Sequence, residues 1–464
     1  MKKLISLLLA LVMVLSLAAC GQTAPAPAPE ATNAPVDTPV VDATDAPEEK
    51  EPVVLSMWAL GTVEGVDKVY QDWSDAVNAQ YPWITIDYEP MTTDVLTEKL
   101  AVASATGTTP DLYLDAYSRI APVVNAGLTM DITDVYEANK DRFYSEERDG
   151  IVDGKNFYIS YYTGAVYCMV VNMTLAEKLG VADMLPEDME TWSYDEFLDV
   201  CRAAKAADPS VIPTVLYAGS RSGDSWYYSW FLGNGAEITN EDLTAVAISD
   251  GENKEKALEV MDVFATLIEE DLVPDGAASL IDSNAQEMFC AGNVLFFPTG
   301  YNKIAQMPQK IADGVCVEAD FDAVAIPTKE GKEPPRSVSF GSYGVVGFAN
   351  NGNEEAVKLA IDVLLKSPEL RKEEIKLRGQ LSTMNDCVIE YATEDVTAIM
   401  ARAADYSGRA AYSTFGILEP WWSDFRETFY VQLQDYYAGN IDAETMLANW
   451  QETGTAVITA ANNK

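Results

Sequence analysis

The chain has 464 residues, of which 73 are acidic, 31 are basic and none is histidine, so its formal net charge is −42. A charge of this size and sign repels nucleic acids and anionic lipid headgroups at long range, and we expect no nucleic-acid partner. The lack of histidine removes the commonest general base, every Ser-His-Asp or Cys-His arrangement and the commonest zinc ligand. Much enzyme chemistry is therefore excluded. We expect no enzyme activity, no cofactor and no metal site.

The first 19 residues have the pattern of a secretory signal. Lys2 and Lys3 precede an uncharged stretch from Leu4 to Ala19, which is shorter than the roughly 20 apolar residues that span a bilayer. The following Leu17-Ala18-Ala19-Cys20 resembles the lipobox of bacterial lipoproteins, in which cleavage falls just before a lipidated cysteine. This resemblance implies that Cys20 anchors the protein to the outer face of the cell membrane through two acyl chains. A simple signal peptide with an incidental cysteine is the alternative.

Residues 20–52 are expected to be a disordered linker. The segment after Cys20 holds seven Asp or Glu, is rich in proline and alanine, and has no aromatic side chain. Such a composition cannot bury enough apolar surface to offset the entropy of ordering. We expect a tether between membrane and fold, or else a cleaved spacer.

The residues beyond Pro52 predict two α/β lobes. They number about 410, more than one typical core accommodates. Residues 53–58, 84–88 and 110–116 have strand patterns, and apolar residues at helical spacing separate them, in residues 66–77 and 94–105. Strands that alternate with helices indicate a parallel sheet with right-handed crossovers.

The same alternation continues in the second half. A capping box at Ser193 to Glu196 starts a helix, residues 258–268 have helical spacing, and residues 293–298 form a buried strand. A further helix covers residues 356–364, Ser367-Pro368 starts another, and the last 45 or so residues look helical. The five cysteines after Cys20 fit small buried hydrophobic residues better than a disulfide framework, with one disulfide left open.

Five phrases in this order resemble the extracellular solute-binding proteins of family 1, the oligosaccharide receptors of ABC importers. They are PDLYLDAYSRIAPVVNAGLTMDITD (110–134), YYTGAVYCMVVNMTLAEKLGV (161–181), TWSYDEFLDVCRAAK (191–205), MFCAGNVLFFPTGYNKI (288–304) and FGSYGVVGFANNGNEEAVKLAIDVLLKSPE (340–369). Two phrases depart from the family pattern: Asn172-Met173 stands for the usual Asn-Lys, and Gly300-Tyr301-Asn302 stands for Gly-Pro-Trp or Gly-Tyr-Trp. These departures bear on the identity of the sugar.

The resemblance implies an α/β fold of two Rossmann-like lobes with a multi-segment hinge, like the type II periplasmic binding proteins and maltose-binding protein. We place the crossings between lobes near Thr163, Pro327 and Pro368. The amino-terminal lobe is then residues 53–163 and 327–368, and the carboxyl-terminal lobe is residues 164–326 and 369–464.

A ligand of an open α/β sheet lies beyond the carboxyl ends of the strands. A sugar needs aromatic faces for its C–H patches and charged or amide groups for its hydroxyls. The stacking candidates are Trp58, Tyr117, Tyr162, Trp226, Tyr301 and Trp421, of which Tyr301 and Trp58 lie just past expected strands. The polar candidates are Glu64, Asp115, Arg119, Arg221 and Asn302, and Tyr161, Ser342 and Tyr343 complete the expected site. For each of them the alternative is a core aromatic or a solvated loop charge.

The sequence therefore predicts a monomeric, lipid-anchored receptor that captures an oligosaccharide between two lobes and delivers it to the transmembrane subunits of an ABC permease. A receptor for a polyamine is one alternative, because the chain is acidic. A secreted glycosidase is another, because 73 acidic residues make some carboxylate pair inevitable. A surface adhesin without an enclosed ligand is a third.

Overall fold

The structure is a computed structural model that describes residues 50–463 except 62, 145–148, 164–166, 188, 220–222, 332–335, 339–341, 349–351, 410, 414, 418 and 420. The expected signal peptide, nearly all of the linker, Cys20 and Arg221 lie outside the described residues. So does the segment that directly follows Thr163, where the first crossing is expected. Residues 51–464 form one compact unit.

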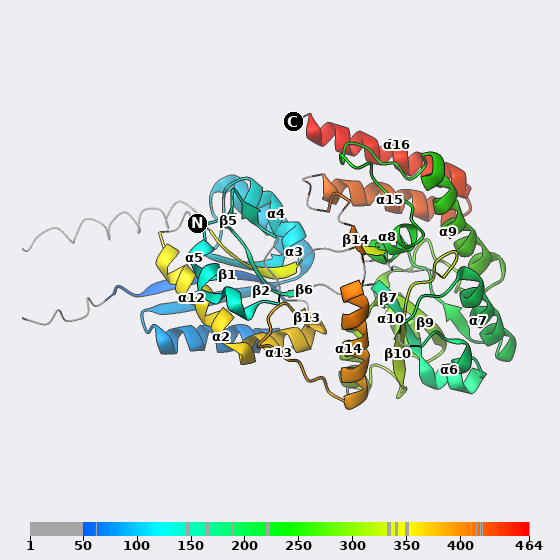
Figure 1. Cartoon of the computed structure of the whole chain (residues 1–464), viewed down its shortest axis with the longest axis horizontal. Helices are drawn as coiled ribbons and strands as arrows, with labels where there is room; N and C mark the ends of the chain where they lie inside the picture. Colours follow the sequence, from blue (N-terminus) through cyan, green and yellow to red (C-terminus); the bar gives the residue numbers. More distant parts are fainter. Residues whose placement is uncertain are drawn as a thin grey trace, which may run out of the picture. The chain divides into compact units, whose positions relative to one another are not determined.

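The first lobe is built on a six-stranded sheet (Figure 1). Its strands, in spatial order, are β13 (Leu381–Ser382), β6 (Ile159–Thr163), β12 (Ser342–Gly347), β3 (Leu112–Ala116), β1 (Val53–Leu60) and β2 (Ile84–Met91). The three strands that come first in the chain are parallel, and β12 runs antiparallel to β3 and β6. The predicted strands 53–58, 84–88 and 110–116 are confirmed, and the parallel arrangement is confirmed for this part of the sheet.

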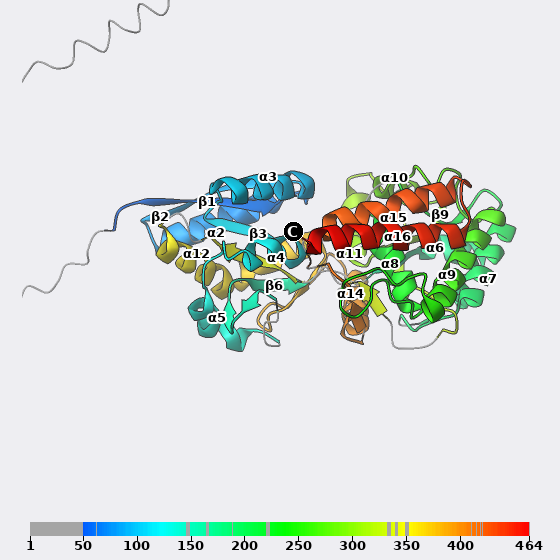
Figure 2. The same ribbon diagram turned by 90° about the horizontal axis from the view of Figure 1, so that it is seen from above.

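Helices cover both faces of this sheet. They are α2 (Val66–Gln80), α3 (Thr93–Thr106), α4 (Tyr117–Asn125), α5 (Thr133–Asn139), α12 (Glu354–Lys366) and α13 (Pro368–Arg378). One core joins α2, α12 and α13 to Leu55 and Met57 of β1, and a second core joins α3 and α4 to Tyr113 of β3. Figure 2 shows α3 on the side of the sheet opposite to α2 and α12. The helical spacing predicted for 66–77 is confirmed, because Val66, Tyr70 and Trp73 are buried.

The second lobe is built on a four-stranded sheet. Its strands, in spatial order, are β10 (Phe321–Val324), β7 (Tyr167–Asn172), β9 (Val294–Gly300) and β8 (Ile212–Thr214). Its helices are α6 (Met173–Leu179), α7 (Tyr194–Ala207), α8 (Asp224–Gly233), α9 (Gly251–Glu269), α10 (Asp282–Cys290), α11 (Asn302–Ala312), α14 (Glu394–Arg409), α15 (Trp422–Tyr437) and α16 (Ala443–Asn462). The last two run side by side, as both views show (Figures 1 and 2). One large core joins this sheet to its helices.

Short elements complete the chain. They are the 3-10 helices η1 (Lys140–Arg142) and η2 (Ala182–Met184), the hairpin of β4 (Ile151–Val152) and β5 (Lys155–Asn156), and the parallel pair of β11 (Arg336–Val338) and β14 (Ala411–Ser413). The two-lobe, periplasmic-binding-protein-like α/β architecture expected from the sequence is confirmed.

Two predicted helix starts can be checked atom by atom. The Ser193 side chain accepts from the Glu196 backbone N–H at 3.2 Å, and Glu196 Oε2 accepts from the Ser193 backbone N–H at 2.7 Å. The predicted capping box is therefore confirmed. Pro368 occupies the first turn of α13 as predicted, but the Ser367 side chain makes no capping hydrogen bond.

The core around the six-stranded sheet continues beyond Pro368. It contains Ile375 of α13 as well as Met384 and Cys387, and β13 pairs with β6. These contacts keep α13 and β13 with the first lobe, because their apolar side chains have their partners there. We therefore propose that the third crossing lies after Cys387, and not at Pro368 as the sequence suggested.

The cysteines divide into one disulfide and three thiols. Cys290 at the end of α10 and Cys316 after α11 form a disulfide with a sequence separation of 26. Cys168, Cys201 and Cys387 are free and buried. The interpretation as small buried hydrophobic residues is confirmed for these three, and the disulfide that the sequence left open is present.

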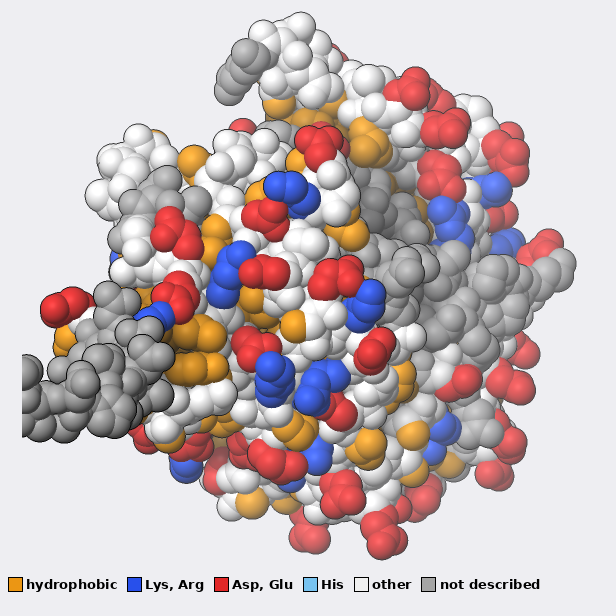
Figure 3. All heavy atoms as spheres, turned by 60° about the vertical axis from the view of Figure 1, so that its left-hand side comes forward, with side chains coloured by type: hydrophobic (Ala, Val, Ile, Leu, Met, Phe, Trp, Pro, Cys, Tyr) orange, Lys and Arg blue, Asp and Glu red, His pale blue; other side chains and the backbone are white. Residues whose placement is uncertain are grey.

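Acidic side chains are spread over the face of the molecule in Figure 3, with basic side chains between them. Many are paired in the described part of the chain, for example Lys68 with Asp72 and Lys358 with Asp134. Exposed pairs of this kind contribute little stability, because water and salt screen them. Within the described residues no helix has the length and apolar character needed to cross a membrane.

Candidate functional site

Strand β3 ends at a buried carboxylate that holds an arginine. Asp115 and Arg119 lie four residues apart across the junction of β3 and α4, so their side chains meet on one side of the first helical turn. Arg119 Nε donates to Asp115 Oδ2 at 2.8 Å, and Nη2 donates to Oδ1. The Asp115 side chain is fully buried, whereas 22% of the Arg119 side chain is exposed. The result is a guanidinium in a fixed orientation at the end of the strand.

Electrostatics keep this arginine charged. Burial acts to lower the pKa of Arg119, but the charge of Asp115 and its hydrogen bonds outweigh burial and raise that pKa above its ordinary value. Asp115 also accepts from the backbone N–H of Ala116 at 2.8 Å and from the Tyr113 hydroxyl at 3.3 Å. The carboxylate is thus satisfied within the protein and orients Arg119.

A stacked pair of tyrosines lies beside Arg119. Tyr343 of β12 pairs with Ala116 of β3 and with Tyr162 of β6 in the backbone ladder. The Tyr162 and Tyr343 rings stack with centroids 5.0 Å apart and planes 10° from parallel, and Arg119 Cζ is 6.0 Å from the Tyr343 centroid. Tyr162 is buried and Tyr343 is half-buried. A half-exposed ring beside a fixed cation can offer an apolar face and hydrogen-bond donors to one ligand.

Two further predicted residues make contacts within the first lobe. Ser342 Oγ donates to Asp149 Oδ2 at 2.5 Å, and its backbone N–H donates to the same oxygen at 3.1 Å. The Tyr117 ring packs on Tyr158 with centroids 5.0 Å apart. These residues support the strand end, because their polar or aromatic groups already have protein partners.

The second lobe contains a comparable carboxylate and guanidinium pair. Asp224 in the first turn of α8 is 1% exposed at its side chain, and it pairs with Arg426 of α15, whose side chain is 22% exposed. Arg426 Nη2 donates to Asp224 Oδ1 at 2.9 Å, and Nε donates to Oδ2. Arg426 Cζ lies 5.8 Å from the Trp422 ring centroid. Each lobe therefore presents an arginine that a buried aspartate orients beside an aromatic ring.

Tyr167 interacts electrostatically with residues of both lobes. It begins β7, pairs with Gly300 of β9 and is half-buried. Burial raises the pKa of the Tyr167 hydroxyl; a hydrogen bond with Ser225 opposes that rise, and the charge of Asp224 and the Tyr343 hydroxyl add to it. Tyr167 is therefore within electrostatic range of Asp224 and Arg426 in the second lobe and of Tyr343 in the first lobe.

A second polar group lies where α10 and α11 begin. Lys303 Nζ donates to Gln286 Oε1 at 3.3 Å and lies 3.9 Å from Asp282 Oδ2. Burial raises the pKa of Asp282, and the charge of Lys303 and a hydrogen bond from Tyr217 offset part of that rise. Both helices begin at the end of the sheet where β9 stops, so this group lies at the carboxyl end of that strand.

Four predicted residues lie in the protein interior. Tyr161, Trp226 and Trp421 are each 1% exposed, and Tyr301 is 0% exposed. Trp226 stacks on Tyr227 with centroids 3.9 Å apart, and Trp421 packs edge-on against Phe425. A ring without exposed surface offers no face to a ligand, so we do not retain these four in the proposed site.

Three other predicted residues are accessible. Trp58 is half-buried, Lys99 Nζ lies 4.2 Å from its ring centroid, and with α3 it lines a hollow of about 520 Å3 to which none of the other predicted residues contributes. Glu64 is exposed in the turn before α2. Asn302 is half-buried at the start of α11, next to Lys303. Asn302 therefore lies beside the polar group of α10 and α11, whereas Trp58 lines a separate hollow.

Sequence reasoning missed Tyr167, Arg426, Asp282 and Lys303. Tyr167 lies in a phrase that resembles the family, but it is not among the predicted site residues. Arg426 is the only basic residue in the sequence of α15, where aromatic residues surround it, and this was the available signal. The partner that holds it, Asp224, is 202 positions away, so no local pattern connects the two.

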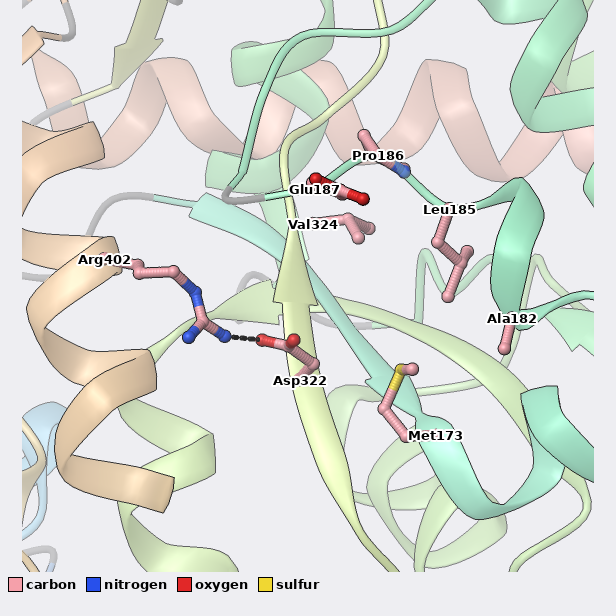
Figure 4. Close-up of a pocket in the computed structure, with 8 residues that line it drawn as sticks. All are labelled: Met173, Ala182, Leu185, Pro186, Glu187, Asp322, Val324 and Arg402. Carbon is pink, nitrogen blue, oxygen red and sulfur yellow. Dashed lines mark hydrogen bonds and ion pairs between the residues drawn. The ribbon is translucent and has the colours of Figure 1, made fainter. Parts of the chain in front are cut away.

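A separate hollow lies on the second lobe (Figure 4). Its volume is about 300 Å3, and its lining includes Met173, Leu185, Val324 and an ion pair in which Arg402 Nη2 donates to Asp322 Oδ1 at 2.5 Å. In the close-up Arg402 of α14 reaches Asp322 of β10 across one side of the hollow (Figure 4). None of the predicted site residues lines it. In the described part of the chain no three Cys, Asp or Glu side chains are placed to hold a metal ion.

Comparison with known proteins relates this chain to one protein family. The sequence profile of the bacterial extracellular solute-binding proteins matches residues 63–369. A protein of Brucella abortus (strain 2308), whose name describes it as a binding protein, is 24% identical over 399 residues, which cover 84% of this chain and 89% of that protein.

Several solved structures have a similar fold. Some of them contain a bound sugar, and another is named after the sugar that it binds. The GacH receptor of Streptomyces glaucescens, solved unliganded and with acarbose, aligns with a TM-score of 0.69 at 15% identity and covers 88% of this chain and 99% of its own. A chitin oligosaccharide binding protein aligns with a TM-score of 0.71 at 19% identity, over 89% of this chain and 100% of its own. RafE in complex with raffinose aligns with a TM-score of 0.68 at 15% identity, over 87% and 99%. At these identities the likeness shows the fold.

Proposed function

Because this chain belongs to the bacterial extracellular solute-binding protein family, whose members are receptors of ABC transporters and not enzymes, we propose that its ligand is a carbohydrate, in particular an oligosaccharide. The observation that carries the proposal is the half-exposed Tyr343 ring, stacked on Tyr162 and flanked by the oriented guanidinium of Arg119. The proposed site contains Tyr343 and Arg119 on the first lobe and Tyr167, Arg426 and Asn302 on the second.

The charges of this site favour a neutral ligand. Arg119 is balanced by Asp115 and Arg426 by Asp224, so neither pair adds a net charge. Such pairs offer guanidinium donors and aromatic faces, which suit the hydroxyls and C–H patches of a sugar. The sugars named for the similar structures support the same ligand class.

We propose that binding works by closure of the two lobes. A ligand held by Tyr343 on one lobe and Tyr167 on the other contacts both sets only when they approach each other, so it shifts the population toward the closed form. The permease would then distinguish the closed form from the open one. We further propose that the receptor acts as a monomer.

We propose that Cys20 is the membrane anchor. The signal-like segment before it and the acidic linker after it support this arrangement. Expression with a radiolabelled fatty acid should label the natural chain and leave a Cys20→Ser variant unlabelled. Equal labelling of both would contradict the proposal.

A thermal-shift panel tests the ligand class. The mature chain with Cys20→Ser is mixed separately with malto-, xylo- and chito-oligosaccharides, raffinose, polyamines and short peptides. A sugar at about 100 times its Kd should stabilise the fold by about 2.7 kcal/mol, which appears as a higher Tm. Chromatography should then recover that sugar intact. The proposal fails if only polyamines or peptides raise the Tm. A chain that responds to no solute at all would favour the adhesin alternative.

A further inference from the structure

Helix α13 contains one buried carboxylate and guanidinium pair and contributes an arginine to a second, partly buried pair. Glu374 and Arg378 are four residues apart on the helix, and Arg378 Nε donates to Glu374 Oε1 at 2.9 Å. The second pair joins Arg371 to Asp386. Glu374, Arg378 and Arg371 are 2%, 4% and 0% exposed. A buried charge pair adds little stability compared with apolar residues of the same volume. The groups to which the pair forms its other hydrogen bonds are therefore a better guide to its role.

The hydrogen bonds of the Glu374 and Arg378 pair converge on the strand ends of the first lobe. Arg378 Nη2 donates to the carbonyl oxygen of Leu60, the last residue of β1, at 2.6 Å, and to the Tyr70 hydroxyl at 2.9 Å. The Tyr161 hydroxyl of β6 donates to Glu374 Oε2 at 2.7 Å. One pair on α13 therefore ties together the carboxyl end of β1 and the end of β6.

The same arginine supports the stacked tyrosines. Arg378 Cζ lies 5.9 Å from the ring centroid of Tyr162, and Tyr162 stacks on Tyr343. The backbone of Tyr162 lies between β12, where it pairs with Tyr343, and β13, where it pairs with Ser382. Strand pairing thus holds the Tyr162 backbone on both sides, and its ring lies close to both the Arg378 guanidinium and the Tyr343 ring.

We propose that Arg378 is a positioning residue for ligand binding, which holds Tyr162 in place and through it sets the face that Tyr343 offers to the ligand. The inference rests on the proposed function for its ligand and on the contacts above for its geometry. A ring that is already oriented loses less conformational freedom on binding, so its ligand is held more tightly. A cation near the Tyr162 ring adds an attraction that depends on its position.

Arg371 is a matched control on the same helix. Its Nε donates to the Leu364 carbonyl at 3.2 Å, and its Nη2 donates to Asp386 Oδ1 at 2.9 Å. It is as buried as Arg378, but none of its hydrogen-bond partners among the described residues is a tyrosine of the site. Loss of either arginine should lower stability, and only loss of Arg378 should disturb Tyr343.

The test compares Arg378→Met with Arg371→Met in the mature chain. Calorimetric titration well below the Tm measures the Kd for the sugar that gives the largest thermal shift in the panel. We expect Arg378→Met to raise the Kd about tenfold, within the range of coupling seen for residues in one network, and Arg371→Met to change it less than about twofold. In a Tyr343→Ala background the effect of Arg378→Met should nearly vanish. Equal effects of both arginine variants, or fully multiplicative effects with Tyr343→Ala, would overturn the proposal.

A ligand-free measurement separates this inference from the proposed function. In protein labelled with 3-fluorotyrosine, the 19F resonance of Tyr343 is assigned by its loss in Tyr343→Phe. It should shift or broaden in Arg378→Met and stay unchanged in Arg371→Met. An unchanged resonance overturns the positioning role even if a sugar binds, and a shifted one supports that role even if no sugar in the panel binds. If Arg378→Met does not fold, Arg378→Lys keeps the charge but loses the planar fork, and a smaller shift is expected.

Discussion

Tyr343 stacks on Tyr162 with planes 10° from parallel, and the two rings differ in exposure: Tyr162 is buried and Tyr343 is half-buried. The buried Tyr162 ring supports the Tyr343 ring, and the Tyr343 ring is partly accessible from solvent. This relationship joins the interior of the first lobe to the proposed ligand site, because β6 and β12 are neighbours in the sheet.

Removal of the Tyr343 ring should weaken sugar binding strongly. We expect Tyr343→Ala to cost about 2 kcal/mol or more, about thirtyfold in Kd, because it removes a central aromatic contact. Tyr343→Phe keeps the stacking face and should cost much less. Tyr144→Ala is the control, since Tyr144 is 66% exposed and lies outside the proposed site. Titration calorimetry checks all three, and a Tyr343→Ala protein with the natural affinity would remove Tyr343 from the site.

Replacement of Arg119 by lysine should weaken binding although it keeps the charge. A lysine cannot bond both oxygens of Asp115 as the guanidinium does, so its ammonium is not held in the same orientation. We expect a Kd about tenfold higher, or about 1.4 kcal/mol. Arg142→Lys makes the same change at a pair with Asp386 that has no described contact with Tyr343. The prediction is contradicted if both variants bind the sugar with the same Kd.

Gly379 is expected to be intolerant of a side chain for a reason beyond its backbone conformation. Its φ is +64°, and a Cβ there would lie 2.4 Å from the carbonyl oxygen of Asn302 at the start of α11. Gly107, with φ of +70° and no atom within 4 Å of such a Cβ, is the matched control. Gly107→Ala should cost about 1 kcal/mol from strain alone, and Gly379→Ala should cost clearly more and also raise the Kd. Urea unfolding measures the loss of stability in each variant, and titration calorimetry measures the Kd. Equal losses of stability in both variants would show that the backbone at Asn302 moves aside at little cost.

Asp131 should contribute to stability only above acidic pH. Hydrogen bonds from the Thr133 hydroxyl and from Lys155 lower the pKa of Asp131 to about 2. A lowered pKa gives stabilisation that is complete above the unfolded value of roughly 4 and is lost as the pH falls toward 2. The Tm difference between the natural protein and Asp131→Asn should therefore be constant from about pH 5 to 7 and shrink below pH 4. A difference that stays the same down to pH 2 would contradict the assignment.

The disulfide between Cys290 and Cys316 should stabilise the second lobe. A closed loop of this length restricts the unfolded chain, which predicts a loss of about 3 kcal/mol in the double variant Cys290→Ser/Cys316→Ser. A reducing agent should lower the Tm of the natural protein and leave that of the double variant unchanged. Cys201→Ser serves as a control, because Cys201 is free and buried and its variant should remain sensitive to reduction. Calorimetric scans with and without reductant measure these changes in Tm.

The sequence by itself determined the class of the elements and their order. Helical spacing over residues 66–77 and the capping box at Ser193 depend on local hydrogen bonds and on the period of buried residues, and both appear in the structure as predicted. Those periods also indicate parallel strands joined by helices, and with the family resemblance they led to a two-lobe α/β fold. Asp115 and Arg119 were candidates because they lie at the end of a predicted strand, and the ion pair between them joins residues only four positions apart.

Only the tertiary structure decided which aromatic residues offer a face to solvent and which arginines are held in place. Trp226, Tyr301 and Trp421 were predicted in the same site as Tyr343, yet packing in the second lobe buries them. The pairs of Asp224 with Arg426 and of Arg378 with the Leu60 carbonyl join residues 202 and 318 positions apart. A periodic pattern reports one element's apolar face, whereas exposure and long-range hydrogen bonds depend on which elements the completed fold brings together.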